Sequence, residues 1–235
     1  MSTRTLGRIV VAASLVAAGL VVFTGSAAAD FHLMRVDEVF AGTVSDASAD
    51  FVELEMQADL QGNVSSHPLQ LFDASGARFD CSLPADVPNQ NAGDEILFAT
   101  QQAAVAFSIT PDFVIPPMLD GTSGAACFAS VDCASWGSFT GTTPSPAGTP
   151  FASGIPPGQS IDRTADTNNS AGDFAPSTPN PEANVGNLGT MTCQPFTGTG
   201  GGGGGAASVK DLKAKVRGTR ATITGRIDPP APGEK

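Results

Sequence analysis

Apolar and polar residues alternate along several short stretches of the chain, and this period of two predicts β-strands. In the clearest case Val52, Leu54 and Met56 share one face of a strand, which we expect to face a core. Glu53 and Glu55 share the other face, which we expect to meet solvent. Strands are predicted in this way at residues 33–40, 51–56, 69–72, 77–83, 95–99 and 104–109.

The chain beyond residue 110 is rich in proline and glycine, with only short apolar islands. The islands lie at residues 113–115 and 127–136 and at Phe151 and Ile155. Such a composition predicts long ordered loops with a few short strands. Because strand patterns recur without alternating helical ones, residues 30–193 are predicted to be an all-β domain, with two sheets packed as a sandwich.

The first 29 residues have the layout of a secretory signal peptide. Arg4 and Arg8 precede an uncharged run at 9–23, and small residues end at Ala29, after which cleavage is predicted. The alternative is a membrane anchor, which this run fits less well because a spanning helix needs about 20 apolar residues. We therefore expect residues 1–29 to be removed and the protein to be secreted, with no membrane span after cleavage.

Charge is distributed unevenly, which narrows the class of partner. Residues 30–205 hold 20 acidic side chains and three arginines but no lysine, whereas residues 206–235 hold seven basic and three acidic ones. Nucleic-acid affinity depends on lysines and arginines that displace counterions from phosphates. The acidic body is therefore not expected to bind nucleic acid, and its charge favours solubility.

Four cysteines form an even set, which in an exported chain indicates two disulfides with three conceivable pairings. Only five residues separate Cys127 from Cys133, so a local bridge between them is favoured, and Cys81 is left to pair with Cys193. The alternative is a structural zinc site. It is disfavoured because no cysteine pair has the two- or four-residue spacing typical of such sites.

A run of six glycines at 200–205 predicts a flexible linker, placed at 194–208. The basic segment at 209–235 contains two β-like stretches followed by a proline-rich turn. These stretches resemble the opening hairpin of an immunoglobulin-like module, and a lone hairpin is only marginally stable in water. The tail is interpreted either as the start of a second module, truncated after Lys235, or as a flexible, mostly disordered arm.

Two blocks of sequence resemble the lamin-tail-like domain family. Residues 36–39 and 50–54 are similar to the first two strands of that family. The second block is similar to its last strand and C-terminal signature, and comprises IPPGQSIDR at 155–163, DTNNSAGDF at 166–174, TPNP at 178–181 and Asn184. The resemblance spans about residues 33–187. It implies an immunoglobulin-like β-sandwich, and bacterial members of the family occur in secreted proteins, sometimes beside nuclease or other hydrolase domains.

Asp166, Asn168 and Ser170 suggest a metal site, because alternating oxygen side chains on a turning loop can converge on Ca²⁺. The EF-hand pattern is not met, since Ala171 and Ser177 stand where it requires glycine and glutamate. The alternative is a loop whose side chains bond their own backbone, which the family resemblance supports. On the first interpretation Ca²⁺ is a cofactor, and on the second no cofactor is expected.

Catalytic chemistry is poorly represented, because no catalytic motif is recognised and the chain has two histidines and no tyrosine. His67 lies in a turn, which is more typical of a solvated residue than of a triad. Glu53 and Glu55 are more typical of a polar strand face than of a glycosidase pair. Trp136 beside Cys133 is more typical of core than of a carbohydrate platform.

These observations favour a secreted, non-catalytic β-sandwich that binds an unidentified protein or glycan at the bacterial cell surface or outside the cell. We expect no enzymatic activity in this chain. Two alternatives stay open. One is an accessory domain of a larger secreted nuclease or hydrolase, and the other is a Ca²⁺-dependent surface protein.

Overall fold

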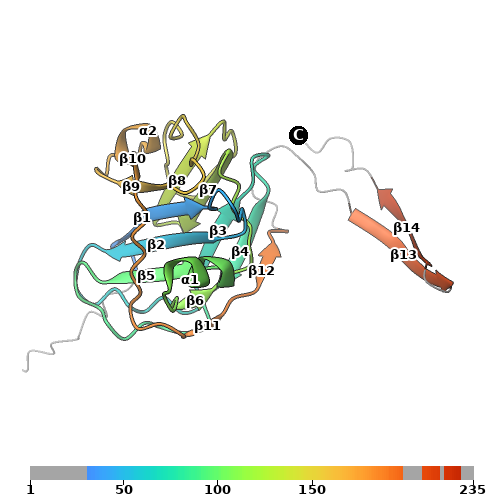
Figure 1. The fold of residues 1–235 in the computed structure, drawn as a ribbon, viewed down its shortest axis with the longest axis horizontal. Coiled ribbons are helices and arrows are strands. Elements are labelled where there is room, and N and C mark those ends of the chain that lie inside the picture. Colours follow the sequence, from blue (N-terminus) through green and yellow to red (C-terminus); the bar gives the residue numbers. More distant parts are fainter. Residues whose placement is uncertain (1–30, 198–207, 218–219, 229–235) are drawn as a thin grey trace, which may run out of the picture.

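A computed structural model describes residues 31–197 and the backbone of residues 208–217 and 220–228. The body at 31–197 consists mostly of β-strands arranged in two sheets, with two short helices (Figure 1). The predicted all-β class is therefore confirmed. The signal-peptide assignment at 1–29, the glycine run at 200–205 and the question of truncation after Lys235 lie outside the described residues.

In the larger sheet β1, the first strand of the described residues, lies in the interior with a partner on each side. Its order is β10-β9-β1-β2-β5-β6-β11, and its neighbours are antiparallel except for the parallel pairs of β6 with β5 and with β11. The strands are β1 (Met34–Ala41), β2 (Asp50–Met56), β5 (Glu95–Ala99), β6 (Phe113–Val114), β9 (Ser160–Arg163), β10 (Phe174–Ser177) and β11 (Gly189–Thr190).

The smaller sheet is antiparallel throughout, in the order β12-β4-β3-β7-β8. Its strands are β3 (Pro68–Phe72), β4 (Arg78–Ser82), β7 (Ser123–Phe128), β8 (Asp132–Gly137) and β12 (Cys193–Pro195). The apolar island at 127–136 is thus part of a regular hairpin. The N–H group of Phe196 still donates to the Arg78 carbonyl at 2.9 Å, so the contacts of the body extend beyond the boundary predicted at 193.

The core lies between the facing sides of the two sheets. Val52, Leu54 and Met56 are fully buried there, as the alternating pattern predicts. Each such side chain contributes roughly 1.5–3 kcal/mol by leaving water. Trp136 is also fully buried, and its indole N–H donates to the Asp120 carbonyl at 2.7 Å. Its ring is therefore core and offers no carbohydrate platform.

The strand predicted at 104–109 is wrong, because this stretch belongs mainly to helix α1 (Gln101–Phe107). The Thr100 hydroxyl oxygen accepts the N–H group of Ala103 at 3.1 Å and so caps the helix. Phe107 packs against Phe40 on the outer side of the larger sheet. The other helix is α2 (Ser170–Asp173). Neither helix in the described part of the chain is long and apolar enough to cross a membrane.

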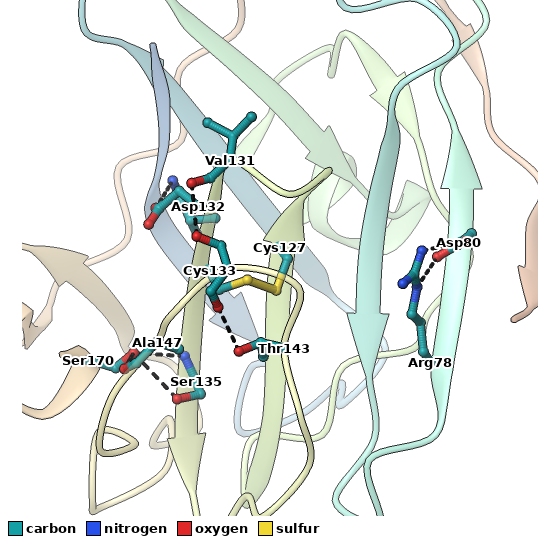
Figure 2. The surroundings of a disulfide bond; sticks show 12 residues. Arg78, Asp80, Cys127, Val131, Asp132, Cys133, Ser135, Thr143, Ala147 and Ser170 are labelled. Atoms are coloured by element: carbon teal, nitrogen blue, oxygen red, sulfur yellow. Dashed lines mark hydrogen bonds and ion pairs between the residues drawn. A yellow bond between two sulfur atoms is a disulfide. The ribbon is translucent and has the colours of Figure 1, made fainter. Parts of the chain in front are cut away.

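Two disulfides join the cysteine pairs that the sequence favours. Cys127 and Cys133 are directly opposite residues of the β7–β8 hairpin (Figure 2). Cys81 of β4 is bonded to Cys193 of β12 across 112 residues of sequence. The second bridge ties the C-terminal end of the body to the smaller sheet.

The two β-like stretches of the tail form an antiparallel hairpin. Its strands are β13 (Ser208–Arg217) and β14 (Arg220–Asp228). The hairpin agrees with the strand character expected for the segment after the linker. Its assignment to a second immunoglobulin-like module stays a prediction.

Candidate functional site

The outer side of the larger sheet carries a cluster of carboxyl groups. The register of β1 against β2 shifts between Val36 and Glu38, and this β-bulge brings Asp37 and Glu38 to the same side. Neighbouring strands add further acidic side chains at the positions that alternate with core residues. Together they form what we call the acidic face, which consists of Asp37, Glu38, Glu53, Glu55, Glu95 and Asp162.

Residues 178–188, here called the strap, connect β10 to β11 by crossing the acidic face (Figure 1). An extended chain advances about 6 to 7 Å in two residues and strands lie about 4.8 Å apart, so an oblique crossing passes one strand every two residues. The contacts of the strap follow this spacing. The Asn180 N–H donates to the Glu38 carboxylate in β1, and the Glu182 N–H donates to the Glu53 carboxylate in β2. The Asn184 side-chain amide then donates to the Glu95 carbonyl in β5.

Asp112 anchors the second half of the strap. This fully buried side chain stands just before β6 and accepts four backbone N–H bonds of 2.7–2.9 Å. One donor is Leu97 of β5, and the other three are Asn184, Val185 and Gly186 of the strap. The Asp112 carboxylate thereby ties the strap to β5, beside the further hydrogen bonds between Asn184 and Asn89 and from the Leu188 N–H to the Asp112 carbonyl.

The strap changes the environment of two glutamates. Glu38 and Glu53 are each only 4 % exposed. The prediction that Glu53 faces solvent is therefore wrong, because a segment 129 residues later in the chain covers it. Between strap and sheet lies a cavity of about 190 Å³, lined by Asp37, Glu38, Glu53, Glu95, Asp162, Ser177, Thr178, Asn180 and Glu182.

Burial and mutual repulsion raise the pKa of these carboxyl groups. Desolvation is the largest cause, and with repulsion from neighbouring carboxylates it raises the pKa of Glu53 to about 9 and that of Glu95 to about 10. Desolvation also raises the pKa of Glu38 to about 7. The pKa of Asp37 rises to about 6, since Arg35 offsets part of the effect of burial.

Three of these carboxyl groups lie close enough to share a cation. Oxygen atoms of Asp37, Glu55 and Glu95 all lie within 4.8 Å of one another. Carboxylate oxygens are the ligands that Ca²⁺ prefers. Arg35 already forms ion pairs with Asp37, at 3.0 Å, and with Glu55. A metal ion at this point would share those two carboxylates with the guanidinium group.

The ligands predicted for Ca²⁺ have other contacts in this structure. The buried Ser170 hydroxyl donates to the Ala147 carbonyl at 3.0 Å (Figure 2). Asp166 lies 3.5 Å from Arg163 in an ion pair, and Asn168 has a left-handed backbone with a φ of 56°. These contacts fit a loop that satisfies its own backbone, and the Ca²⁺ assignment stays a prediction.

Asp173 organises this loop through hydrogen bonds. Its carboxylate accepts hydrogen bonds from the Thr167 and Asn169 N–H groups at 2.9–3.0 Å. The Thr167 hydroxyl donates to it at 2.6 Å. Sequence reasoning missed this role, although an aspartate a few residues after an Asp-Thr-Asn-Asn run is typical of such self-bonded loops.

The two histidines lie together near the start of the body. The Phe31 ring stacks on His67 at 3.3 Å and on His32 at 4.3 Å between ring centroids. Neither histidine lines the cavity of the acidic face. The cavity therefore offers carboxyl, hydroxyl and amide groups.

No protein-family model, curated protein or solved structure matches the chain.

Proposed function

We propose that this protein is an exported, non-catalytic binding module of the lamin-tail-like type, with its two sheets packed as an immunoglobulin-like sandwich. The observation that carries the proposal is the pairing of all four cysteines within a two-sheet β body. Such disulfides persist mainly in oxidising compartments outside the cytoplasm. The signal-like sequence of residues 1–29 supports the same location.

The arrangement of the strands supports the family assignment. The two blocks that resemble the lamin-tail-like family are separated by about 100 residues in the sequence. In the larger sheet they lie together, because β1 pairs with β2 on one side and with β9 on the other, and β10 follows β9. The family's signature residues would thus build one continuous surface.

The acidic face supports a binding role and indicates the chemistry of the ligand. A cavity lined by carboxyl, hydroxyl and amide groups suits a partner that presents positive charge. Among envelope molecules this favours a protein with exposed lysine or arginine side chains. The same charge disfavours nucleic acid.

A pull-down from cell-envelope fractions tests this function. We expect the immobilised mature chain to retain one or a few envelope components, and we expect retention to fall as salt is raised because Coulomb attraction is screened. An unrelated exported protein of similar negative charge is the control for charge alone. Recovery of the same components by both proteins, or of none by either, would contradict specific binding.

A second candidate function, a Ca²⁺-dependent surface protein, is favoured by the proximity of Asp37, Glu55 and Glu95. Ca²⁺ that binds only the folded state stabilises it by about 2.7 kcal/mol at a concentration one hundred times its Kd. We therefore expect a chelator to lower the melting temperature of the mature chain. Glu95→Gln should abolish this effect if Ca²⁺ binds at the acidic face, and Asp166→Asn if it binds in the predicted loop. An unchanged melting temperature removes calcium from the function.

The alternative function, an accessory domain of a larger secreted hydrolase, is tested on the gene. It requires catalytic residues in a longer protein that includes this chain. A reading frame that continues beyond Lys235 into a metal-binding hydrolase motif would support it, and a stop codon at that point would contradict it.

A further inference from the structure

The tail hairpin has two chemically different faces, because a β-bulge keeps its strands in phase. The pairing of β13 with β14 shifts register between Lys210 and Lys213, just where the basic residues of β13 change from even to odd positions. Residues that lie opposite each other, and residues two apart along a strand, share one face of the pair. The face that we call the basic face carries Lys210, Lys213, Lys215, Arg217, Arg220 and Arg226 and, at its end, Asp228. Asp211 lies within the bulge.

The opposite face of the hairpin is apolar. It is shared by Val209, Ala214, Val216, Ala221, Ile223 and Ile227. Two sheets that pack as a sandwich bury apolar faces of this kind against each other. In the predicted second module this face would meet the core, so the basic face is the one left for a partner. In the described residues no strand outside the hairpin pairs with β13 or β14.

The body of the same chain carries the complementary charge. Residues 31–197 contain 19 acidic side chains, three arginines and no lysine, which gives a net charge of −16. Residues 208–228 contain six basic and two acidic side chains, which gives a net charge of +4. Opposite charges steer two molecules toward each other and favour complementary surfaces over like-charged ones. An anionic partner for the basic face is therefore present in every second copy of the chain.

Within the body, the acidic face has carboxyl groups that a docked hairpin can reach. The Glu55 side chain is 21 % exposed, and Glu182 on the strap is exposed. Glu95 lines the cavity of about 190 Å³, and one of its carboxyl oxygens is buried and accepts no hydrogen bond from the described residues. A lysine or arginine side chain supplies the N–H donor that this oxygen lacks, and a positive charge beside a carboxyl group favours its ionised form.

The length of the linker favours docking between copies. Residues 198–207 separate the body from the hairpin, and a flexible linker of this length spans about 16 to 19 Å on average. The linker follows β12, which belongs to the smaller sheet, whereas the acidic face lies on the outer side of the larger sheet. Packed sheets lie about 10 Å apart, so a path to the acidic face of the same copy has to pass around both sheets. A second copy is not limited in this way.

We propose that the basic face of one molecule docks on the acidic face of a second molecule, so that copies of this chain associate head to tail. The inference rests on the proposed role of the acidic face in binding a positively charged partner, and it names that partner as the chain itself. The two molecules contribute different surfaces, so each pair retains one free hairpin and one free acidic face. Association therefore continues into rings or open chains. Docking also gives the hairpin the neighbours without which it is only marginally stable.

Sedimentation velocity of residues 30–235 under non-reducing conditions tests the association. We expect the average mass to rise with protein concentration at about 0.05 M salt and to return to that of the monomer at about 0.5 M, because salt screens exposed charges. A mass that is independent of concentration at the lower salt would overturn the proposal.

Two variants separate the two surfaces of the contact. Lys213→Glu with Lys215→Glu alters only the basic face, and Glu55→Gln with Glu182→Gln removes charge only from the acidic face. Each variant alone should associate about fivefold or more weakly than the unchanged protein. An equal mixture should form a dimer of one copy of each, because the intact hairpin of the second variant still fits the intact acidic face of the first. A mixture that stays monomeric would overturn the proposal.

Asp59→Asn with Asp86→Asn is the matched control for net charge. These carboxylates lie in loops, where they accept the Ala92 and Ser65 N–H groups, and the control should associate as the unchanged protein does. If the variant with Glu55→Gln and Glu182→Gln also associates unchanged, the hairpins pair with each other and the proposal is wrong. The pull-down from envelope fractions detects partners other than this chain, so its result distinguishes failure of this inference from failure of the proposed function.

Discussion

Replacement of Asp112 by alanine is expected to lower the free energy of unfolding by about 3–5 kcal/mol, the size of effect that follows when several hydrogen bonds to one buried charge are lost. The Leu97 amide would remain buried with no acceptor, and the amides of Asn184, Val185 and Gly186 would lose their partner on the sheet. For a body of this size the melting temperature should fall by roughly 10 °C, at about 2 to 4 °C per kcal/mol. Thermal melting of residues 30–235 under non-reducing conditions provides the measurement.

Asp112→Asn is the matched control for the size of the side chain. Asparagine keeps one oxygen but turns an NH₂ group toward amide donors, so we expect an intermediate loss. If the alanine variant loses less than about 1 kcal/mol, the amides of the strap find water instead and Asp112 does not anchor it.

Removal of the Arg163 side chain should lower the free energy of unfolding by a similar amount. Its guanidinium group is almost fully buried, donates to the Val36 carbonyl at 2.7 Å and pairs with Asp132 at 2.5 Å. Arg163 belongs to the larger sheet and Asp132 to the smaller one, so the pair joins the two sheets. Arg163→Met leaves the Asp132 charge buried without its cation, and breaking a buried pair in this way costs about 3–5 kcal/mol. Urea denaturation at neutral pH measures the loss.

The pH dependence of the same variant distinguishes a lost charge from lost packing. Burial already raises the pKa of Asp132, although Arg163 lowers it in part. Without Arg163 the pKa rises further, so the folded variant takes up a proton as the pH falls and recovers stability. The deficit of Arg163→Met should therefore be smaller at about pH 4 than at about pH 7. The double variant with Asp132→Leu should recover most of the loss, apart from the unpaired Val36 N–H. An equal deficit at both pH values would indicate that packing dominates.

Local patterning was sufficient to predict the strands that face the core. Val52, Leu54 and Met56 are buried as expected because the period of two is a direct property of strand geometry. The same rule failed at 104–109, where the alternation is short and Val105 is largely exposed on a helix. There the capping hydroxyl of Thr100 carried the better signal.

The candidate site was less predictable because its environment comes from distant sequence. Glu53 lies on the outer side of β2 as expected, but nothing near it in sequence indicates the strap. The role of Asp112 was equally hidden in the sequence, since the three strap N–H groups that it accepts lie more than 70 residues further along the chain. A charged residue becomes buried in this way only when the whole chain has folded.

The interior position of β1 in the larger sheet has a consequence for the order of folding. This strand is the first of the body to be made, yet its partner β9 and the strap that covers it are among the last. Folding therefore waits for contacts between distant parts of the chain, and topologies of this kind fold slowly, on a scale of milliseconds to seconds. If the chain is exported from its N-terminus, as proposed above, slow folding keeps the early segments extended and able to thread a membrane pore. The sheet becomes complete only after the residues that close it have followed.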